Sequence, residues 1–166
     1  MGGDGVRDAA FLADHLAIET RIDRLALRPA TAADEDFLLS LRKQTMTEHL
    51  SRVGLAFDDA HHRQRLLANY ADASVICLGE DAVGLFKAYR RDTAWVLMQI
   101  QLAPASQGRG IGAALIEALI AQARREGVPV TLSVLKGNPA RRLYDRLGFR
   151  VVAEDEHEYE MRCDER

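Results

Sequence analysis

The sequence predicts a single domain of the α/β (α+β) class, in which helices cover both faces of one mixed, mostly antiparallel sheet. Three observations support this prediction: the length of 166 residues, an average composition, and a hydrophobic period that alternates between helix and strand values along the chain. Because 48% of the residues are hydrophobic and 28% are charged, the chain can bury one core and is not disordered, collagen-like or a disulfide framework.

The chain is expected to begin with an extension, residues 1–24, followed by the main domain, residues 25–166. Apolar side chains between Phe11 and Ile18 share one helical face, so this extension is expected to contain a helix. Residues 25–28 alternate between apolar and polar side chains and are followed by proline, which predicts the first strand of the domain.

Two helices are expected after this strand. Thr31 or Asp34 offers a side-chain oxygen that can cap a helix running to about His49. Residues 58–70 repeat apolar side chains at helical spacing, so they predict a second helix. Its apolar stripe is formed by Leu66, Leu67 and Tyr70.

The hydrophobic period then changes to that of strands, and it returns to that of a helix after residue 109. Turn residues separate three strands of an antiparallel meander, residues 74–78, 82–90 and 93–102. Gly127 and Gly148 stand where helix C-caps are expected. The remaining elements are predicted to be a helix at 110–126, a strand at 130–135, a helix at 138–147, and strands at 150–153 and 157–162.

Charge and cysteine content exclude several function classes. The formal charge of −3 gives no reason to expect binding to nucleic acid or an anionic membrane, and no apolar run is long enough to span a bilayer. The two cysteines, Cys77 and Cys163, form neither a metal-ligand spacing nor a disulfide framework. We therefore expect a cytoplasmic protein without a metal cofactor.

The sharpest motif is the glycine-rich segment Gln107-Gly108-Arg109-Gly110-Ile111-Gly112-Ala113, between a predicted strand and a predicted helix. Glycines allow close backbone approach, and a helix N-terminus presents free N–H groups and partial positive charge, so the segment predicts an anion site, most simply for a pyrophosphate. The alternative is that these glycines form only a tight turn.

The same segment also satisfies the dinucleotide pattern G-x-G-x-x-G/A, which would indicate a nucleotide-binding oxidoreductase. This interpretation is disfavoured because the segment follows an antiparallel meander and only 54 residues come after Gly112. In addition, the next strand ends at Leu135-Lys136 without an acidic residue to bind a ribose hydroxyl.

Two blocks resemble the GCN5-related N-acetyltransferase (GNAT) superfamily. Gln107, Gly110 and Gly112 match its Q/R-x-x-G-x-G/A motif for acyl-CoA. The run from Asn138 to Phe149 is similar to its second block, N-x(2,3)-A-x-x-L-Y-x-x-x-G-F, and the order of elements over residues 25–163 also agrees.

The resemblance implies acetyl-CoA as co-substrate and assigns residues to it. The backbone of Gln101 and Leu102 would bind the pantetheine arm, and Asn138 would bind the arm or position the second block. The pyrophosphate would be held by Gln107, Gly108, Arg109, Gly110, Ile111, Gly112 and Ala113.

Tyr144 is the expected catalytic residue. The resemblance places it beside the thioester, where a phenol with a pKa near 10 can protonate the departing thiolate. Without the resemblance, Tyr144 would be interpreted as a core aromatic of the helix at 138–147.

The general base is not evident. Some relatives carry a glutamate on the strand before the motif, whereas this chain carries Gln99 and Gln101, which cannot accept a proton there. Histidine, glutamate and tyrosine side chains near the expected acceptor pocket are the candidates, each of which is also consistent with an ordinary surface position: Glu48, His49, His61, His62, His157 and Tyr159.

The predicted function is transfer of an acetyl group from acetyl-CoA to a primary amine of a small molecule by direct attack. Glu48, Asp58 and Asp59 suggest a cationic acceptor such as a polyamine, an amino acid derivative or an aminoglycoside. Acetylation of a protein N-terminus or lysine, and acyl-CoA sensing without catalysis, are the alternatives. The resemblance also implies a homodimer formed through the final strands.

Overall fold

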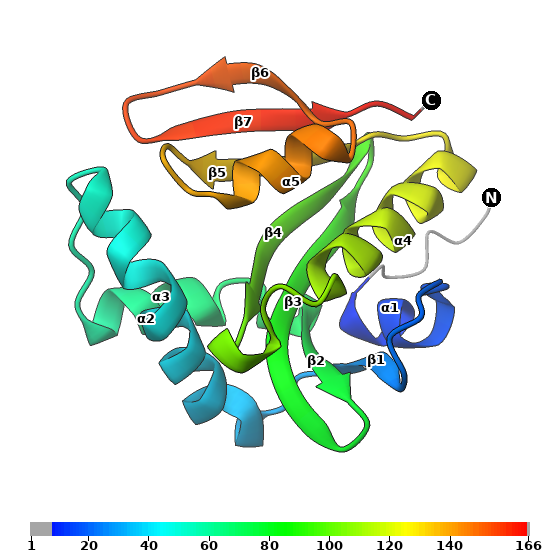
Figure 1. Ribbon diagram of the computed structural model, residues 1–166, viewed down its shortest axis with the longest axis horizontal. Helices are drawn as coiled ribbons and strands as arrows, with labels where there is room; N and C mark the ends of the chain where they lie inside the picture. The colour runs from blue at the N-terminus through cyan, green and yellow to red at the C-terminus, as the bar shows by residue number, and fades with distance from the viewer. Residues whose placement is uncertain (1–7, 166) are drawn as a thin grey trace.

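The computed structural model describes residues 8–165, in which seven strands form one sheet and helices cover both of its faces, as predicted (Figure 1). The first seven residues of the expected extension lie outside this range. The strands are β1 (Leu25–Pro29), β2 (Ala73–Leu78), β3 (Asp81–Arg91), β4 (Ala94–Leu102), β5 (Val130–Leu135), β6 (Arg150–Glu154) and β7 (Glu158–Cys163). The helices are α1 (Ala9–His15), α2 (Glu35–Arg52), α3 (Asp59–Leu67), α4 (Ile111–Glu126) and α5 (Ala140–Arg146).

The sheet has the order β1-β2-β3-β4-β5-β7-β6. All neighbouring strands are antiparallel except β4 and β5, which are parallel and are connected through α4. The parallel pair therefore joins two antiparallel halves, and the strand order places β7 rather than β6 beside β5.

Each face of the sheet buries its own apolar cluster. On one face, α1 and α4 pack on a cluster that contains Phe86 and Trp95. On the other face, Leu38 of α2 and Leu66 of α3 pack against Leu85. Figure 1 shows α2 and α3 on one side of the sheet and α1 and α4 on the other. Burial of these apolar side chains is the main favourable contribution to the stability of the domain.

The central parallel pair of strands is short because β4 carries a bulge. β4 and β5 pair only from Trp95↔Val130 to Leu97↔Leu132. On the other side of β4, Leu97 pairs with Ala88 and Gln99 with Lys87, so Met98 is the extra residue. A bulge bends its strand, and beyond it β4 diverges from β5 (Figure 1). The β4 edge that faces β5 is therefore unpaired beyond Leu97.

Two helix boundaries differ from the prediction. α3 ends at Leu67 rather than at Tyr70, because the backbone is extended at Ala68 and left-handed at Asn69, where φ is 55°. Leu67 is consequently 40% exposed and does not belong to an apolar stripe. α5 begins at Ala140 rather than at Asn138, whose Oδ1 accepts the Ala140 N–H at 2.9 Å.

Candidate active site

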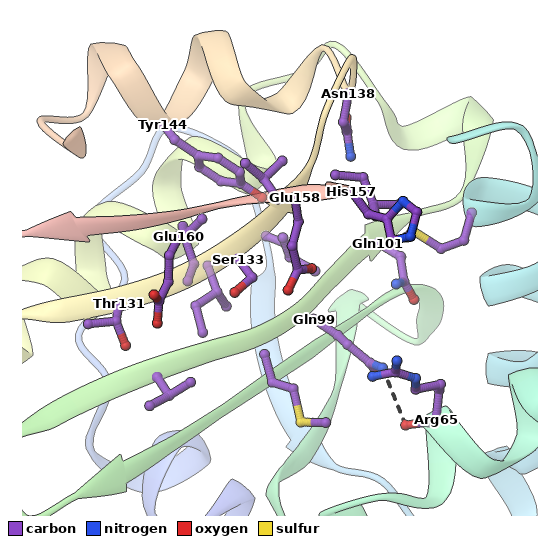
Figure 2. A pocket seen from close by; sticks show the side chains of 18 of the residues that line it. Arg65, Gln99, Gln101, Thr131, Ser133, Asn138, Tyr144, His157, Glu158 and Glu160 are labelled. Carbon is purple, nitrogen blue, oxygen red and sulfur yellow. Dashed lines mark hydrogen bonds between the residues drawn. The ribbon is translucent and has the colours of Figure 1, made fainter. Parts of the chain in front are cut away.

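A groove of about 900 Å³ opens where β4 and β5 diverge. Its walls come from β4 and β5, from α2 and the loop that follows it, from Arg65 near the end of α3, from α5, and from β7 with the segment that leads into it. Figure 2 shows side chains from α5, β4, β5 and β7 directed into this groove. Three of the predicted site residues line it: Gln101, Asn138 and Tyr144.

The glycine-rich loop lies outside the lining of the groove, between the end of β4 and α4. Gly108 and Gly110 have φ of 74° and 79°, which only glycine adopts without strain, and the space where a Cβ would stand is open at both. Gly110 is the N-cap of the 16-residue helix α4, so the first N–H groups of this helix are not used within it.

Two further contacts fix this loop to the strand. The Gln107 side chain donates from Nε2 to the Leu102 carbonyl at 3.0 Å. The Ile111 side chain is buried in the core, so the start of α4 is held firmly against the sheet. Arg109 is exposed. The loop therefore presents a fixed helix N-terminus with N–H groups that the helix does not use, a geometry that favours anions.

Tyr144 lies on α5 with 7% of its surface exposed, and its ring packs edge-on against Phe149 with centroids 5.8 Å apart. Burial raises the pKa of Tyr144 to about 12. The phenol therefore stays protonated at neutral pH and faces the groove as a hydrogen-bond donor (Figure 2).

The floor of the groove carries two buried glutamines on β4, Gln99 and Gln101, which are 9% and 6% exposed. The Gln99 Nε2 donates to the Arg65 carbonyl at 3.3 Å, as drawn in Figure 2. Within residues 8–165, the Oε1 atoms of Gln99 and Gln101 have no hydrogen-bond donor. Both oxygens are therefore buried acceptors without a partner in this part of the chain.

The wall opposite α2 and α3 is acidic, which the sequence analysis did not predict. Asp155, Glu158 and Glu160 line the groove together with His157, and Figure 2 shows Glu158 between Ser133 and Gln101. The pKa of Glu158 is raised, first by burial and then by the neighbouring charge of Asp155. The period of two in β7 places Glu158 and Glu160 on one face, and this was the signal available in the sequence.

Two of the candidate residues, His157 and Tyr159, differ in their surroundings, and His157 lies just before β7 begins. His157 lines the groove, as expected. Tyr159 is not part of the lining: it packs against the core cluster, and the Arg141 guanidinium lies 4.4 Å from its ring centroid. Tyr159 therefore does not face the pocket and has a structural position, which is the alternative that the sequence left open for each candidate.

The wall formed by α2 and α3 is basic. Arg42 is only 5% exposed, and its Nε has no hydrogen-bond partner among the described residues. The pKa of Arg42 is lowered to about 10, first by burial and then by the charge of Arg65. Arg65 in turn lowers the pKa of Glu158, so its guanidinium lies within electrostatic reach of both walls.

The polar residues expected on this side of the pocket do not line the groove. Glu48 is paired with Arg52, and Asp59 is paired with Lys43. Asp58 caps α3 and pairs with His61. The side chains that α2 and its following loop contribute instead are Arg42, Met46, Leu50, Leu55 and Phe57.

The two remaining histidines of this region also lie outside the lining of the groove, His49 and His62. His62 is buried beside the Phe57 ring, and its pKa is lowered by burial and by the charge of Arg42. Within residues 8–165, no group of three or more His, Cys, Asp or Glu side chains is arranged to hold a metal ion. No helix in the same range has the length and apolar character needed to cross a membrane.

Comparison with known proteins gives one family for this arrangement. The model of the acetyltransferase (GNAT) family matches residues 36–149, which include the groove floor, the glycine-rich loop and Tyr144. This match covers more than half of the chain.

Solved structures show the same fold at low sequence identity. An acetyltransferase from Thermus thermophilus superposes with a TM-score of 0.69 at 21% identity, covering 87% of this chain and 99% of that one. The PaiA N-acetyltransferase from Thermoplasma acidophilum, solved in complex with coenzyme A, superposes with a TM-score of 0.66 at 13% identity, and the match covers 84% of this chain and 98% of that one. Arabidopsis thaliana Naa50, in complex with the bisubstrate analogue CoA-Ac-MVNAL, superposes with a TM-score of 0.60 at 14% identity, and the match covers 84% of this chain and 97% of that one.

Proposed function

The chain belongs to the acetyltransferase (GNAT) family and is an acyl-CoA-dependent acetyltransferase, and from this premise we propose that it acetylates a primary amine of a small molecule. The observation that carries the proposal is the groove where β4 diverges from β5, because a protonated phenol and a carboxylate, Tyr144 and Glu158, both face it.

Acetyl-CoA supplies the acetyl thioester when it is bound, and the observed geometry fits it. No strand pairs with β4 at Gln101 and Leu102 on the side that faces β5, so an extended amide-containing arm could bind there in the manner of an added strand, beside the Leu102 carbonyl that accepts from the Gln107 side chain. The loop from Gln107 to Ala113 would hold the pyrophosphate through N–H groups at the start of α4, and Arg109 would add a charge-assisted bond. Asn138 also lines the groove, and its Oδ1 accepts the N–H of Ala140, the first residue of α5.

Tyr144 is proposed to be the general acid. As the carbon–sulfur bond breaks, the phenol gives its proton to the departing sulfur, and with a pKa of about 12 the phenol carries this proton at neutral pH. The rest of the groove holds the two reactants in line, which is a large part of the catalysis available to such a site.

Glu158 is proposed to receive the amine. An ammonium must lose a proton before its nitrogen can form the new carbon–nitrogen bond, and a partly buried carboxylate with a raised pKa is a suitable acceptor for this proton. Glu158 thereby takes the role that Gln99 and Gln101 cannot fill on β4.

Acetylation of a peptide N-terminus is the second candidate, and the observation that favours it is the similarity in fold to Naa50, whose bound analogue joins CoA to a peptide. A homodimer remains a prediction, for which the exposed edge strand β6, with Val151 and Val152 at its surface, offers a surface.

A screen of acceptors tests the proposal. Purified protein is mixed with acetyl-CoA and, separately, with amino acids, polyamines, aminoglycosides and short peptides, and free thiol is measured. Thiol release that depends on a small amine is the expected result. Release only with peptides would favour the second candidate, and binding of acetyl-CoA without release by any amine would contradict acetyl transfer.

A further inference from the structure

Arg42 is the most unusual charged group in the groove, and the proposed chemistry does not use it. Its guanidinium is almost fully buried, and none of the ion pairs within residues 8–165 involves it. Burying a guanidinium without a counter-ion is costly, so buried arginines are normally paired. Arg42 therefore has a binding capacity that the described residues leave unused.

The surroundings of Arg42 increase this cost. The charge of Arg65 lowers the pKa of Arg42, and the charge of Arg42 lowers the pKa of Lys87. Both neighbouring cations therefore repel Arg42. Lys87 is satisfied, because its Nζ donates to the carbonyls of Leu66 and Ala68 at 2.6 and 2.7 Å and to that of Arg65 at 3.3 Å. Arg42 has no comparable acceptor, so an anion arriving through the groove would meet a positive and partly desolvated site.

The acidic residues on the opposite wall give the groove two poles. Asp155, Glu158 and Glu160 form the negative pole, and Arg42 and Arg65 form the positive pole. Both poles line the same groove of about 900 Å³, so a small molecule that spans this groove can contact both. Between them lie the unpartnered oxygens of Gln99 and Gln101, which accept N–H donors.

We propose that the acceptor is a zwitterion, an amine that carries a carboxylate, with the carboxylate bound by Arg42 and the amine placed at Glu158. This inference rests on the proposed function and narrows it from amines in general to amino acids and related amino carboxylates. A guanidinium binds a carboxylate through paired charge-assisted hydrogen bonds. Polyamines have no group for Arg42 and would bring a second positive charge to the positive pole.

The test compares matched acceptors. Glycine, β-alanine, γ-aminobutyrate and leucine are each assayed by thiol release beside the corresponding amide, and putrescine represents the diamines. Because a charge-assisted hydrogen bond contributes on the order of ten- to a hundredfold in affinity, at least one acid is expected to exceed its amide in kcat/KM by about tenfold or more. Amides or putrescine acetylated as well as every acid would overturn the inference and leave acetyl transfer standing.

The second part of the test uses variants of Arg42. Arg42→Gln is expected to remove the preference for the acid over its amide, measured as the ratio of their kcat/KM values, because only the acid uses the guanidinium. Arg42→Met is expected to retain or raise the Tm of the free protein, since it removes an unpaired buried charge. A large fall in Tm, or an unchanged preference in Arg42→Gln, would assign Arg42 a structural role and overturn the inference. If acetyl-CoA binds but no acceptor yields thiol, the proposed function itself fails, and the inference with it.

Discussion

Lys87 of β3 and Gln99 of β4 stand directly opposite each other, and both side chains donate to the same backbone oxygen, the carbonyl of Arg65, at 3.3 Å. Lys87 also binds two further carbonyls at the end of α3. A cation at a helix C-terminus is favoured by the helix dipole. The floor of the groove is thus tied to the helix that carries its basic wall.

Loss of this connection should destabilise the fold. Lys87→Met leaves buried carbonyls at the end of α3 without a donor, and we expect a loss of about 2–4 kcal/mol in the free energy of unfolding, measured by urea denaturation. Lys43→Met, at an exposed ion pair with Asp59, is the matched control and should change stability by less than about 0.5 kcal/mol. An unchanged or increased stability of Lys87→Met would show that removing the buried charge outweighs the lost hydrogen bonds.

The pH dependence of kcat/KM should report the carboxyl of Glu158. Burial and the charges of Asp155 and Glu160 raise its pKa above 4.5, whereas Arg65 and His157 oppose this shift. A base with a raised pKa is active only above that pKa, so activity should be lost as the pH falls through it, by about tenfold per pH unit.

The variant Glu158→Gln tests whether Glu158 is the group whose titration limits activity at low pH. Both proteins are assayed with the same acceptor, so the titration of the acceptor amine affects both profiles equally. The variant should lack the loss of activity at low pH, and its kcat/KM at the optimal pH should be about a hundredfold lower than that of the wild type. Glu156→Gln, whose side chain is 88% exposed, is the control and should retain the wild-type profile. An acid limb that persists unchanged in Glu158→Gln would exclude Glu158 as the base.

The glycine-rich loop can be tested by two substitutions at Gly110. Alanine at φ of 79° introduces strain of about 1 kcal/mol but no charge, so the affinity for acetyl-CoA should remain within a few fold. Glutamate introduces the same strain and places a negative charge at the helix N-terminus, so affinity should fall by about a hundredfold or more. Calorimetric titration distinguishes these results, and near-wild-type affinity of Gly110→Glu would mean that the loop has only a structural role.

Features governed by local sequence were predictable. Gly127 and Gly148 end their helices with φ of 72° and 99°, as turn chemistry requires. The block around Tyr144 carries local contacts of its own: Asn138 accepts the N–H of the first residue of α5, and Phe149 packs against the Tyr144 ring. These residues depend on neighbours within about ten positions, so their pattern is readable in the sequence.

Features governed by strand pairing were not predictable. The bulge at Met98 has no glycine or proline to mark it, although it frees the edge of β4. Lys87 was not singled out, and its burial depends on carbonyls of α3 that lie about twenty residues earlier. Glu158 and Glu160 became groove residues only because β7 pairs with β5, which a sequence pattern does not specify.

The measurement that tests the central claim most directly is steady-state thiol release by Tyr144→Phe with the best small amine, together with calorimetric titration of acetyl-CoA. Because the phenol acts only on the departing sulfur, kcat should fall by about tenfold or more, while the affinity for acetyl-CoA stays within about threefold. Tyr70→Phe, which removes a phenol bonded to Thr31 outside the groove, controls for the loss of a hydroxyl and should retain turnover. Unchanged turnover in Tyr144→Phe would contradict the assignment of Tyr144 as the general acid.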